Sequence, residues 1–205
     1  MKPPPIILAT RSEGKLAELR PLFEAAGFSV VDLDHVEIEE DDDERDLEKF
    51  ETFEENALAK ARYFYETSGG ITTVADDSGL EVAALGGRPG VRSKRWSGRD
   101  DLTGRALDEA NNRKLLTDLA SHADRSARYV CVAAYVGLGR ELTARGECAG
   151  RIVQEARGAN GFGYDPYFES AETGRTFGEM TREQKERISH RGRAFRALFD
   201  RLGDR

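Results

Sequence analysis

The segment Asp76-Asp77-Ser78-Gly79 carries the strongest chemical signal in the chain. It follows the strand-like residues 71–75, so we expect two adjacent carboxylates at the end of a buried strand. Buried carboxylates are costly unless a cation or hydrogen-bond donors compensate them, and carboxylate oxygens suit Mg²⁺ that also binds substrate phosphates. Side chains alternate along a strand, so one Asp is expected to face a ligand and its neighbour to hold the turn. The alternative is a capped turn without a catalytic role.

A second polar segment lies between the first predicted strand and the first predicted helix. A turn that leads into a helix offers free backbone N–H groups and a positive dipole end, which suit a phosphate. A lysine there would add a point charge. The alternative is an ordinary connecting loop with a solvated lysine. The residues of this turn are Thr10, Arg11, Ser12, Glu13, Gly14 and Lys15.

Two later segments combine glycine with aromatic or basic side chains. In residues 161–166, two glycines let the backbone approach a ligand closely, and Phe162 or Tyr164 offers a ring for stacking. Residues 185–192 supply several hydrogen-bond donors beside a glycine. The alternatives are an aromatic-stabilised turn and a basic, solvated helix end. Together, the four segments predict a site for a magnesium nucleoside triphosphate.

Several common catalytic motifs are absent from the sequence. No phosphate-binding Walker loop, dinucleotide glycine fingerprint, zinc-protease HExxH or GxSxG nucleophile elbow occurs. Neither Cys131 nor Cys148 lies in a signature of a reactive thiol. Covalent nucleophilic catalysis, which needs a nucleophile with an identifiable base, is therefore disfavoured.

The composition is that of a soluble globular protein. The 205 residues suit one domain or two small ones, with 39% hydrophobic and 34% charged residues. No apolar run approaches the roughly 20 residues of a membrane span, so neither a membrane partner nor a targeting peptide is expected. Two cysteines make neither a disulfide framework nor a zinc site, which favours a reducing compartment and a cytoplasmic location.

The negative charge is concentrated in one segment. The chain has a net charge of −7, and residues 34–48 contain ten acidic residues against one arginine. We expect a solvated, mobile loop there. An acidic protein is poorly suited to a nucleic-acid backbone, so no nucleic-acid partner is expected. A compact basic site for a small polyanion remains compatible with this charge distribution.

The elements that position these segments are predicted from apolar periodicity and turn signals. Residues 5–9 and 28–33 are expected to form strands, and a helix is expected from Leu16 to a stop at Gly27. Pro21 lies inside that helix and is expected to kink it or split it in two.

Two capping boxes, in which a Thr is followed three residues later by Glu or Gln, predict helix starts at Thr52 and Thr181. Strands and helices mix without a strict βαβ repeat, which favours an α/β fold around a mixed sheet. The further expected elements are a helix over residues 103–119 and a hairpin of residues 126–138 and 141–153 joined by Gly139-Arg140.

The order and the amino-acid sequences of these segments resemble those of the inosine/xanthosine triphosphate pyrophosphatase family. The resemblance implies an α/β fold, an elongated mixed β-sheet flanked by helices with a central substrate cleft, in one domain over residues 1–205 with two lobes. It also implies a homodimer and Mg²⁺ as cofactor. The segments that carry it are residues 8–15, 52–57 with 60–62, 75–80, 86–98, 161–166 and 185–192.

The resemblance also implies a role for each matching residue. Asp77 matches the catalytic base and a metal ligand, and Ser78 a substrate contact. Glu48, five residues before Phe53, falls where the family has a further magnesium ligand. The turn from Thr10 to Lys15 matches the triphosphate-binding loop, with Ser12 in place of the usual Asn. The residues that match the nucleoside pocket are Phe162, Gly163, Tyr164, Asp165, Lys185, His190 and Arg191.

The implied reaction is hydrolysis of the deaminated purine nucleotides ITP, dITP and XTP to the monophosphate and pyrophosphate. Water oriented by Asp77 and the metal would attack the α-phosphorus, and Lys15 and Lys185 would help neutralise the departing pyrophosphate. One alternative is a related pyrophosphatase of the septum-inhibition type, which acts on modified pyrimidine nucleotides. Another is a nucleotide-binding module without turnover.

Overall fold

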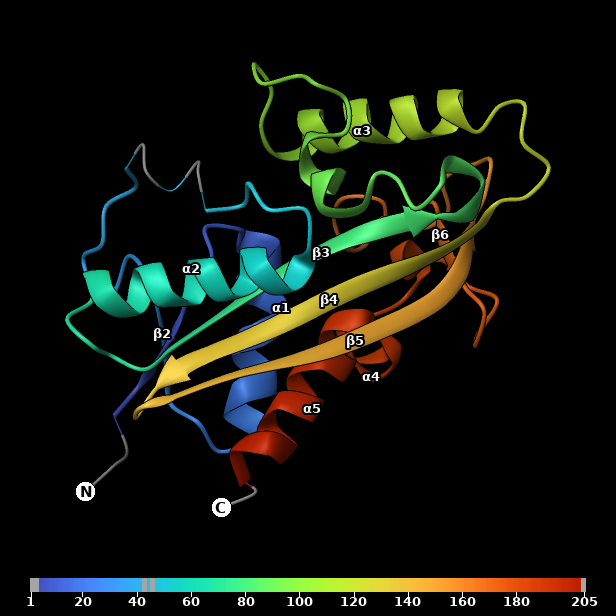
Figure 1. The fold of residues 1–205 in the computed structure, drawn as a ribbon. Coiled ribbons are helices and arrows are strands. Elements are labelled where there is room, and N and C mark those ends of the chain that lie inside the picture. The colour runs from blue at the N-terminus through green and yellow to red at the C-terminus, as the bar shows by residue number, and fades with distance from the viewer. Residues whose placement is uncertain (1–3, 42–43, 45–46, 204–205) are drawn as a thin grey trace. The chain divides into compact units, whose positions relative to one another are not determined.

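A mixed β-sheet forms the centre of the fold. The computed structural model describes residues 4–41, 44 and 47–203, and Figure 1 shows its strands and helices. The strands are β1 (Ile6–Leu8), β2 (Val30–Asp32), β3 (Thr73–Val82), β4 (Ser126–Gly137), β5 (Arg140–Ile152) and β6 (Phe168–Ser170). Their order in the sheet is β2-β1-β3-β4-β5-β6. β1 is parallel to β2 and β3, and β5 is antiparallel to β6, which confirms the predicted mixed sheet.

The chain divides into two compact units. The first comprises Met1–Asp77, Cys131–Gly146 and Arg191–Arg205, and the second comprises Ser78–Val130 and Glu147–His190. β3, β4 and β5 contribute residues to both units. The expected single domain with a central cleft stays a prediction.

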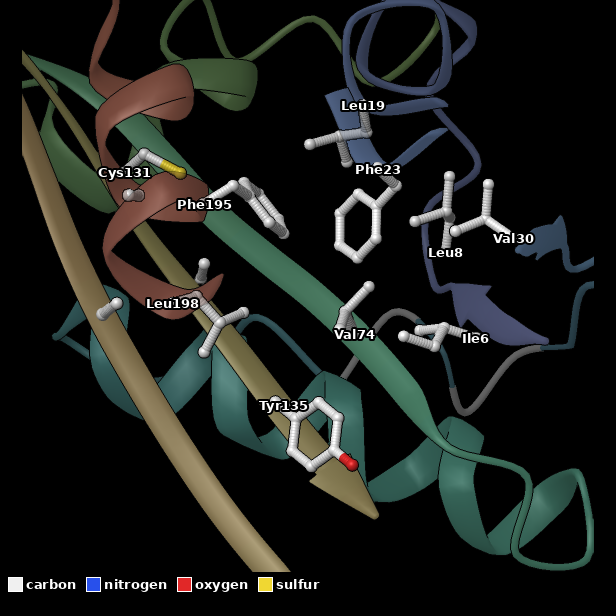
Figure 2. Close-up of a cluster of buried hydrophobic side chains, with 13 residues drawn as sticks. Ile6, Leu8, Leu19, Phe23, Val30, Val74, Cys131, Tyr135, Phe195 and Leu198 are labelled. Carbon is white, nitrogen blue, oxygen red and sulfur yellow. The ribbon is translucent and has the colours of Figure 1, made fainter. Parts of the chain in front are cut away.

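The core of the first unit is an apolar cluster between helices and strands. Its helices are α1 (Glu13–Ala25), α2 (Phe53–Thr67) and, from Arg191 onward, α5 (His190–Gly203). Figure 2 shows Phe23 of α1 and Phe195 of α5 facing each other beside the strands, with ring centroids 5.4 Å apart. The fully buried members of the cluster include Leu8, Phe23, Cys131, Ala133, Ala194, Phe195 and Leu198.

α1 is one continuous helix, although Pro21 lies inside it. The prediction that this proline splits the helix is therefore wrong. Its fixed φ is compatible with helical geometry, and the lost backbone hydrogen bond is offset by burial of Leu19 and Phe23 on the helix face that meets the core. α1 also begins earlier than predicted, because Ser12 caps it and accepts a hydrogen bond from the Lys15 amide.

β3 extends beyond the Asp76-Asp77 pair, which corrects a second expectation. The pair lies within the strand rather than at its end, and the predicted turn at Ser78-Gly79 is absent from it. Leu80 and Val82 explain the continuation, because both are fully buried in the core of the second unit. A Ser-Gly dipeptide often marks a turn, but here burial of the apolar residues that follow it favours continuation of the strand.

The predicted helix starts are confirmed at both capping boxes. Thr52 accepts a hydrogen bond from the Glu55 amide and caps α2, and Thr181 caps α4 (Arg182–Ile188). The helical segment after Thr181 is interrupted at Ser189, which has extended backbone geometry, before α5 begins. The predicted hairpin is also present, but its turn is Leu138-Gly139, one residue earlier than expected. Both turn residues have positive φ, at 51° and 72°, as a type I′ hairpin turn requires.

The second unit has its own aromatic and aliphatic core. Its longest helix is α3 (Gly104–Asp118), close to the predicted bounds, and three short 3₁₀ helices connect its loops: Ala83–Leu85, Gly90–Arg95 and Phe177–Glu179. Among the residues that the structure describes, no helix is long and apolar enough to span a membrane. The fully buried side chains of this core include Leu80, Val82, Leu115, Leu119, Phe168 and Phe177.

The acidic segment has specific contacts where the structure describes it. Arg11 pairs with Glu44 and with Asp34, and the Tyr63 hydroxyl donates to Asp41 Oδ2 over 2.6 Å. Residues 42, 43, 45 and 46, on which the predicted mobile loop also rests, lie outside the described residues. Where it is described, the segment thus makes specific contacts in addition to the solvation that its charge predicts.

We predict that Phe23→Ala lowers the free energy of unfolding by about 3–5 kcal/mol, because it removes a fully buried ring that contacts three other phenylalanines. Equilibrium urea denaturation measures this loss. Phe28→Ala is the matched control, since Phe28 is only partly buried at the edge of the same cluster and its loss should be smaller. Equal losses in the two variants would contradict this account of the core.

Candidate active site

The two adjacent carboxylates of β3 have different partners. Asp76 Oδ2 lies 3.0 Å from Lys15 Nζ and 3.3 Å from Arg191 Nε, so it joins β3 to α1 and α5. Asp77 Oδ2 instead accepts a hydrogen bond of 2.9 Å from Asn56 Nδ2 on α2. Strand alternation separates the two carboxylates, but neither holds a turn, so that part of the prediction is wrong, and the expected ligand contact stays a prediction.

Asp76 is an ionised, buried group. Burial by itself would raise its pKa, but the charges of Lys15, Arg191 and Lys60 outweigh burial and hold the pKa well below the usual range. Arg191 Nη1 also lies 2.5 Å from Glu18 Oε2, so this guanidinium is shared between two carboxylates. Such a buried network is costly to break, because removing one partner leaves an uncompensated charge.

Asp77 has the opposite electrostatic behaviour. Burial, followed by the negative charge of Glu48, raises the pKa of Asp77 to about 6. Lys60, Lys15 and the hydrogen bond from Asn56 act against this rise. A carboxyl with a pKa near 6 is suited to general acid–base chemistry close to neutral pH, since it changes protonation state near the working range.

Glu48 and Lys60 complete the polar cluster of the first unit. Lys60 Nζ forms an ion pair with Glu48 Oε1 and donates to the Asp76 carbonyl over 3.1 Å. Burial lowers the pKa of Lys60, but Glu48, Asp77 and Asp76 more than compensate, so this lysine stays charged. Lys60 lies in one of the segments that carry the family resemblance, but the sequence alone predicts no role for it.

The donor set of this cluster fits a magnesium ion. Glu48 and Asp77 are close enough for the charge of one to raise the pKa of the other, and a divalent cation would relieve this repulsion. Asp76 Oδ1 is buried and has no hydrogen-bond partner among the described residues. No group of three or more His, Cys, Asp or Glu side chains suited to a metal occurs in residues 4–41, 44 and 47–203. Mg²⁺ commonly uses only one or two protein carboxylates, with phosphates and waters as the remaining ligands.

The predicted phosphate-binding turn joins β1 to α1, as expected. Thr10 is buried and its hydroxyl accepts from the Ser12 amide, while Glu13 is exposed and Gly14 partly buried at the start of α1. Lys15 is not the solvated side chain of the alternative interpretation, because its ammonium pairs with Asp76. Arg11 binds Glu44 with two nitrogens.

The predicted nucleoside loop is held by a buried ion pair in the second unit. Asp165 Oδ2 accepts from the Phe162 amide at 2.9 Å and lies 2.5 Å from Lys185 Nζ. Lys185 Nζ also lies 4.9 Å from the centre of the Phe162 ring, within range of a cation–π contact. The alternative of a solvated basic helix end is therefore wrong for Lys185, whose side chain is 5% exposed.

Phe162 is the ring of this loop that suits stacking on a base. It is partly exposed, whereas Tyr164 is buried in the core of the second unit and donates its hydroxyl to the Ser93 carbonyl over 2.7 Å. Burial raises the pKa of Tyr164 well above its ordinary value. Tyr164 therefore supports the loop of residues 161–166 from within the core of the second unit.

Gly163 fixes the position of the same loop through its backbone. Its amide donates to Asp108 Oδ2 at 2.7 Å, and its carbonyl accepts from Asn112 Nδ2 at 2.9 Å. Its φ of 63° lies in the left-handed region that favours glycine. Both partners belong to α3, so this helix anchors the loop.

The remaining predicted residues lie in different surroundings. The His190 ring stacks on Tyr129 with centroids 4.4 Å apart and is almost fully buried. Ser78 is a partly buried residue of β3 in the second unit. Arg191, the next residue after His190, belongs to the first unit.

Each unit thus gathers its own set of predicted residues. The first unit places Lys15, Asp77, Glu48 and Arg191 in one polar cluster, and it holds the turn from Thr10 to Gly14. The second unit joins Phe162, Asp165 and Lys185, with Gly163 and Tyr164 in the same loop and Ser78 and His190 elsewhere in that unit.

Several residues that organise the clusters are not predicted from the sequence. Asn56 is fully buried and donates to Asp77, and Lys60 joins the Glu48 carboxylate to the backbone carbonyl of Asp76. A usable signal was present, because Asn56 and Lys60 occupy the otherwise apolar face of α2 beside Phe53, Ala57 and Ala61. Glu18, Asp108 and Asn112 gave no such signal.

Comparisons with known proteins agree on one family. The model of the Ham1 family matches residues 6–201. A dITP/XTP pyrophosphatase of Mycolicibacterium paratuberculosis is 46% identical, with 97% of this chain and 95% of that protein covered. One from Frankia alni is 47% identical, with 94% of each covered.

Solved structures extend the similarity to the fold. A HAM1 protein from Coxiella burnetii has a TM-score of 0.83 and 35% identity, and covers 99% of this chain and 100% of that chain. A nucleoside-triphosphatase / dITP/XTP pyrophosphatase from Mycobacterium abscessus has a TM-score of 0.69 and 43% identity, with 94% and 97% covered. With the family model matching almost the whole length, the chain belongs to the Ham1 family.

Proposed function

We propose that this protein is a nucleoside triphosphate pyrophosphatase that converts ITP, dITP and XTP to the monophosphate and pyrophosphate. Relatives at 46% and 47% identity over nearly the whole chain are dITP/XTP pyrophosphatases. The observation that carries the proposal is the environment of Asp77, a buried carboxyl with a pKa of about 6 beside Glu48 and Lys60. Perturbed carboxyl pKa values cluster at catalytic sites, which favours an enzyme over a non-catalytic binding module.

We further propose Mg²⁺ as the cofactor, held by Glu48 and Asp77. When bound, it would neutralise phosphate charge and lower the cost of expelling pyrophosphate. The support is the mutual repulsion of the two carboxylates, which a cation relieves. The homodimer implied by the resemblance and the cytoplasmic location inferred from the two cysteines are part of the same proposal.

In the proposed reaction, Asp77 acts as the general base. One water hydrogen passes to an Asp77 oxygen while the water oxygen bonds to the α-phosphorus, and the bond from that phosphorus to the pyrophosphate oxygen breaks. Asn56 orients the carboxyl by donating to Oδ2. Lys60 keeps its positive charge beside Asp77 and favours the ionised form.

Different residues are proposed to bind the phosphates and the base of the substrate. Lys15 and Lys185 are the proposed partners of the triphosphate, and each already holds a buried carboxylate that fixes its ammonium. Phe162 is the proposed stacking ring for the base. His190 and Arg191 are the proposed donors toward the 6-oxo group, although Arg191 already binds Asp76 and Glu18 and so also has a structural role.

We predict that a panel of ITP, XTP, dITP, GTP, ATP and dUTP shows pyrophosphate release with Mg²⁺ mainly from the first three. Adenine presents an amino donor where hypoxanthine presents an acceptor, and a buried mismatch of donors can reject an analogue by about 10⁴-fold. The measurement is kcat/KM for each nucleotide. Preferential hydrolysis of pyrimidine nucleotides would support the alternative of the septum-inhibition type, and no turnover of any nucleotide would overturn the proposal.

We predict that Asp77→Asn lowers kcat by at least about 100-fold, because an amide cannot accept the proton from water. In the wild type, activity should fall at acidic pH as Asp77 becomes protonated. Bound Mg²⁺ opposes this protonation, so the fall should lie below the pKa of about 6 that Asp77 has without the metal. The matched control is Asp32→Asn, on β2 of the same unit and away from Asp77 in a surface ion pair with Arg20. A near-normal kcat in Asp77→Asn would refute the role of this carboxyl.

A further inference from the structure

The loop of residues 161–166 holds the backbone of Phe162 on both sides of its α-carbon. The Phe162 amide donates to Asp165 Oδ2 at 2.9 Å, and the Phe162 carbonyl accepts from the Asp165 amide at 3.2 Å. The amide of the next residue, Gly163, donates to Asp108 Oδ2 at 2.7 Å. The direction in which the Phe162 ring leaves the backbone is therefore set by these hydrogen bonds.

Helix α3 supplies the side chains that fix Gly163. Asn112 Nδ2 donates to the Gly163 carbonyl at 2.9 Å, so both the amide and the carbonyl of this glycine are bonded to the helix. Asp108 and Asn112 are four positions apart and therefore lie on the same face of α3. The helix and the loop both belong to the second unit.

Both of these side chains are unfavourable for the stability of the fold in their positions. Burial raises the pKa of Asp108, against the effects of the Gly163 amide and the charge of Lys94, so its carboxylate is partly desolvated. Asn112 is 7% exposed, and its Oδ1 is buried without a hydrogen-bond partner among the described residues. An unpaired buried polar atom destabilises a protein. Such exceptions to favourable packing are typical of functional positions.

We propose that Asp108 and Asn112 are positioning residues for base binding: through Gly163, they hold the Phe162 ring in the orientation that stacks on a purine. The inference rests on the proposed function, since it concerns the base-binding ring of that site. It gives α3, which lies outside the segments that carry the family resemblance, a part in substrate affinity.

The lysines that are proposed to bind the phosphates have carboxylate partners of their own. Lys15 pairs with Asp76, and Lys185 pairs with Asp165. Two kinds of ligand are therefore expected to respond differently to changes in α3. The affinity for IMP, the monophosphate product expected from ITP, should depend on the Phe162 ring. The affinity for tripolyphosphate, which has no base, should not depend on it.

The test is calorimetric titration of the full-length protein with IMP and with tripolyphosphate, without added metal. We expect Asp108→Ala and Asn112→Ala each to weaken IMP binding about tenfold and to leave tripolyphosphate binding unchanged. Asp108→Asn should stay within about threefold of the wild type, because its amide oxygen can still accept from the Gly163 amide. In steady-state assays with ITP, the two alanine variants should raise KM and leave kcat nearly unchanged.

Two further variants separate a positioning role from a general loss of structure. Glu109→Ala removes the acidic residue next to Asp108, which forms an exposed ion pair with Arg105, and should leave both affinities unchanged. Phe162→Ala removes the ring itself and should weaken IMP binding at least as much as Asp108→Ala. Adding Asp108→Ala to Phe162→Ala should cause no further loss, because Asp108 acts through the ring. Circular dichroism melts establish that each variant is folded at the assay temperature.

Wild-type IMP affinity in Asp108→Ala and Asn112→Ala, with a loss in Phe162→Ala, would overturn the positioning role and leave the proposed function intact. Unchanged IMP affinity in Phe162→Ala would overturn the stacking assignment and the positioning role together. A further loss in the double variant, or an equal loss of tripolyphosphate binding in Asp108→Ala, would also overturn the inference. A wild-type protein that binds tripolyphosphate but not IMP would contradict the proposed function itself, and the inference with it.

Discussion

The buried carboxylate of Asp76 is the interaction on which the first unit depends. It lies on β3 and binds Lys15 of α1 and Arg191 of α5, so one side chain ties two helices to the central strand. Burying a charge is unfavourable unless each partner is in place. The position of the two helices relative to β3 is therefore set by this cluster as well as by the apolar contacts of Phe23 and Phe195.

Strand geometry gives the neighbouring carboxyl, Asp77, a different environment and a different chemical role. Because Asp77 follows Asp76 on the same strand, its side chain points to the opposite face, toward Asn56 of α2. Lys15 and Lys60 lower the pKa of both carboxyls, but Asp76 also has the charge of Arg191, whereas burial and the charge of Glu48 dominate at Asp77. Two identical neighbours thus acquire pKa values on opposite sides of the ordinary one, and only Asp77 is suited to take up a proton near neutral pH.

The sequence predicts local features of the fold well. Thr52 and Thr181 mark helix starts because a cap depends only on residues three positions apart. The mixed sheet and the polar turn before α1 are also predicted correctly. The strand end at Asp77 is wrong, because burial of Leu80 and Val82 depends on residues distant in sequence. Turn rules based on neighbouring residues do not show which apolar surface will cover Leu80 and Val82.

The electrostatics of the candidate site show the same limit of prediction from sequence. The types of Lys15, Asp77 and Lys185 mark them as candidates, but their partners come from other elements. The contact of Arg11 with Glu44 illustrates this, since it joins residues 33 positions apart. Chain topology decides which charged residues share a buried cluster. The pattern of residue types along the sequence does not reveal this grouping.

The most direct test of this account is a pH titration of the carboxyl ¹³C shifts of the two aspartates, assigned with Asp76→Asn and Asp77→Asn. The account predicts that Asp77 titrates near pH 6 and that Asp76 stays ionised throughout the acid range in which the protein remains folded. Titration of both carboxyls near pH 4, the ordinary value for aspartate, would contradict it. So would an Asp76 that binds its proton at a higher pH than Asp77.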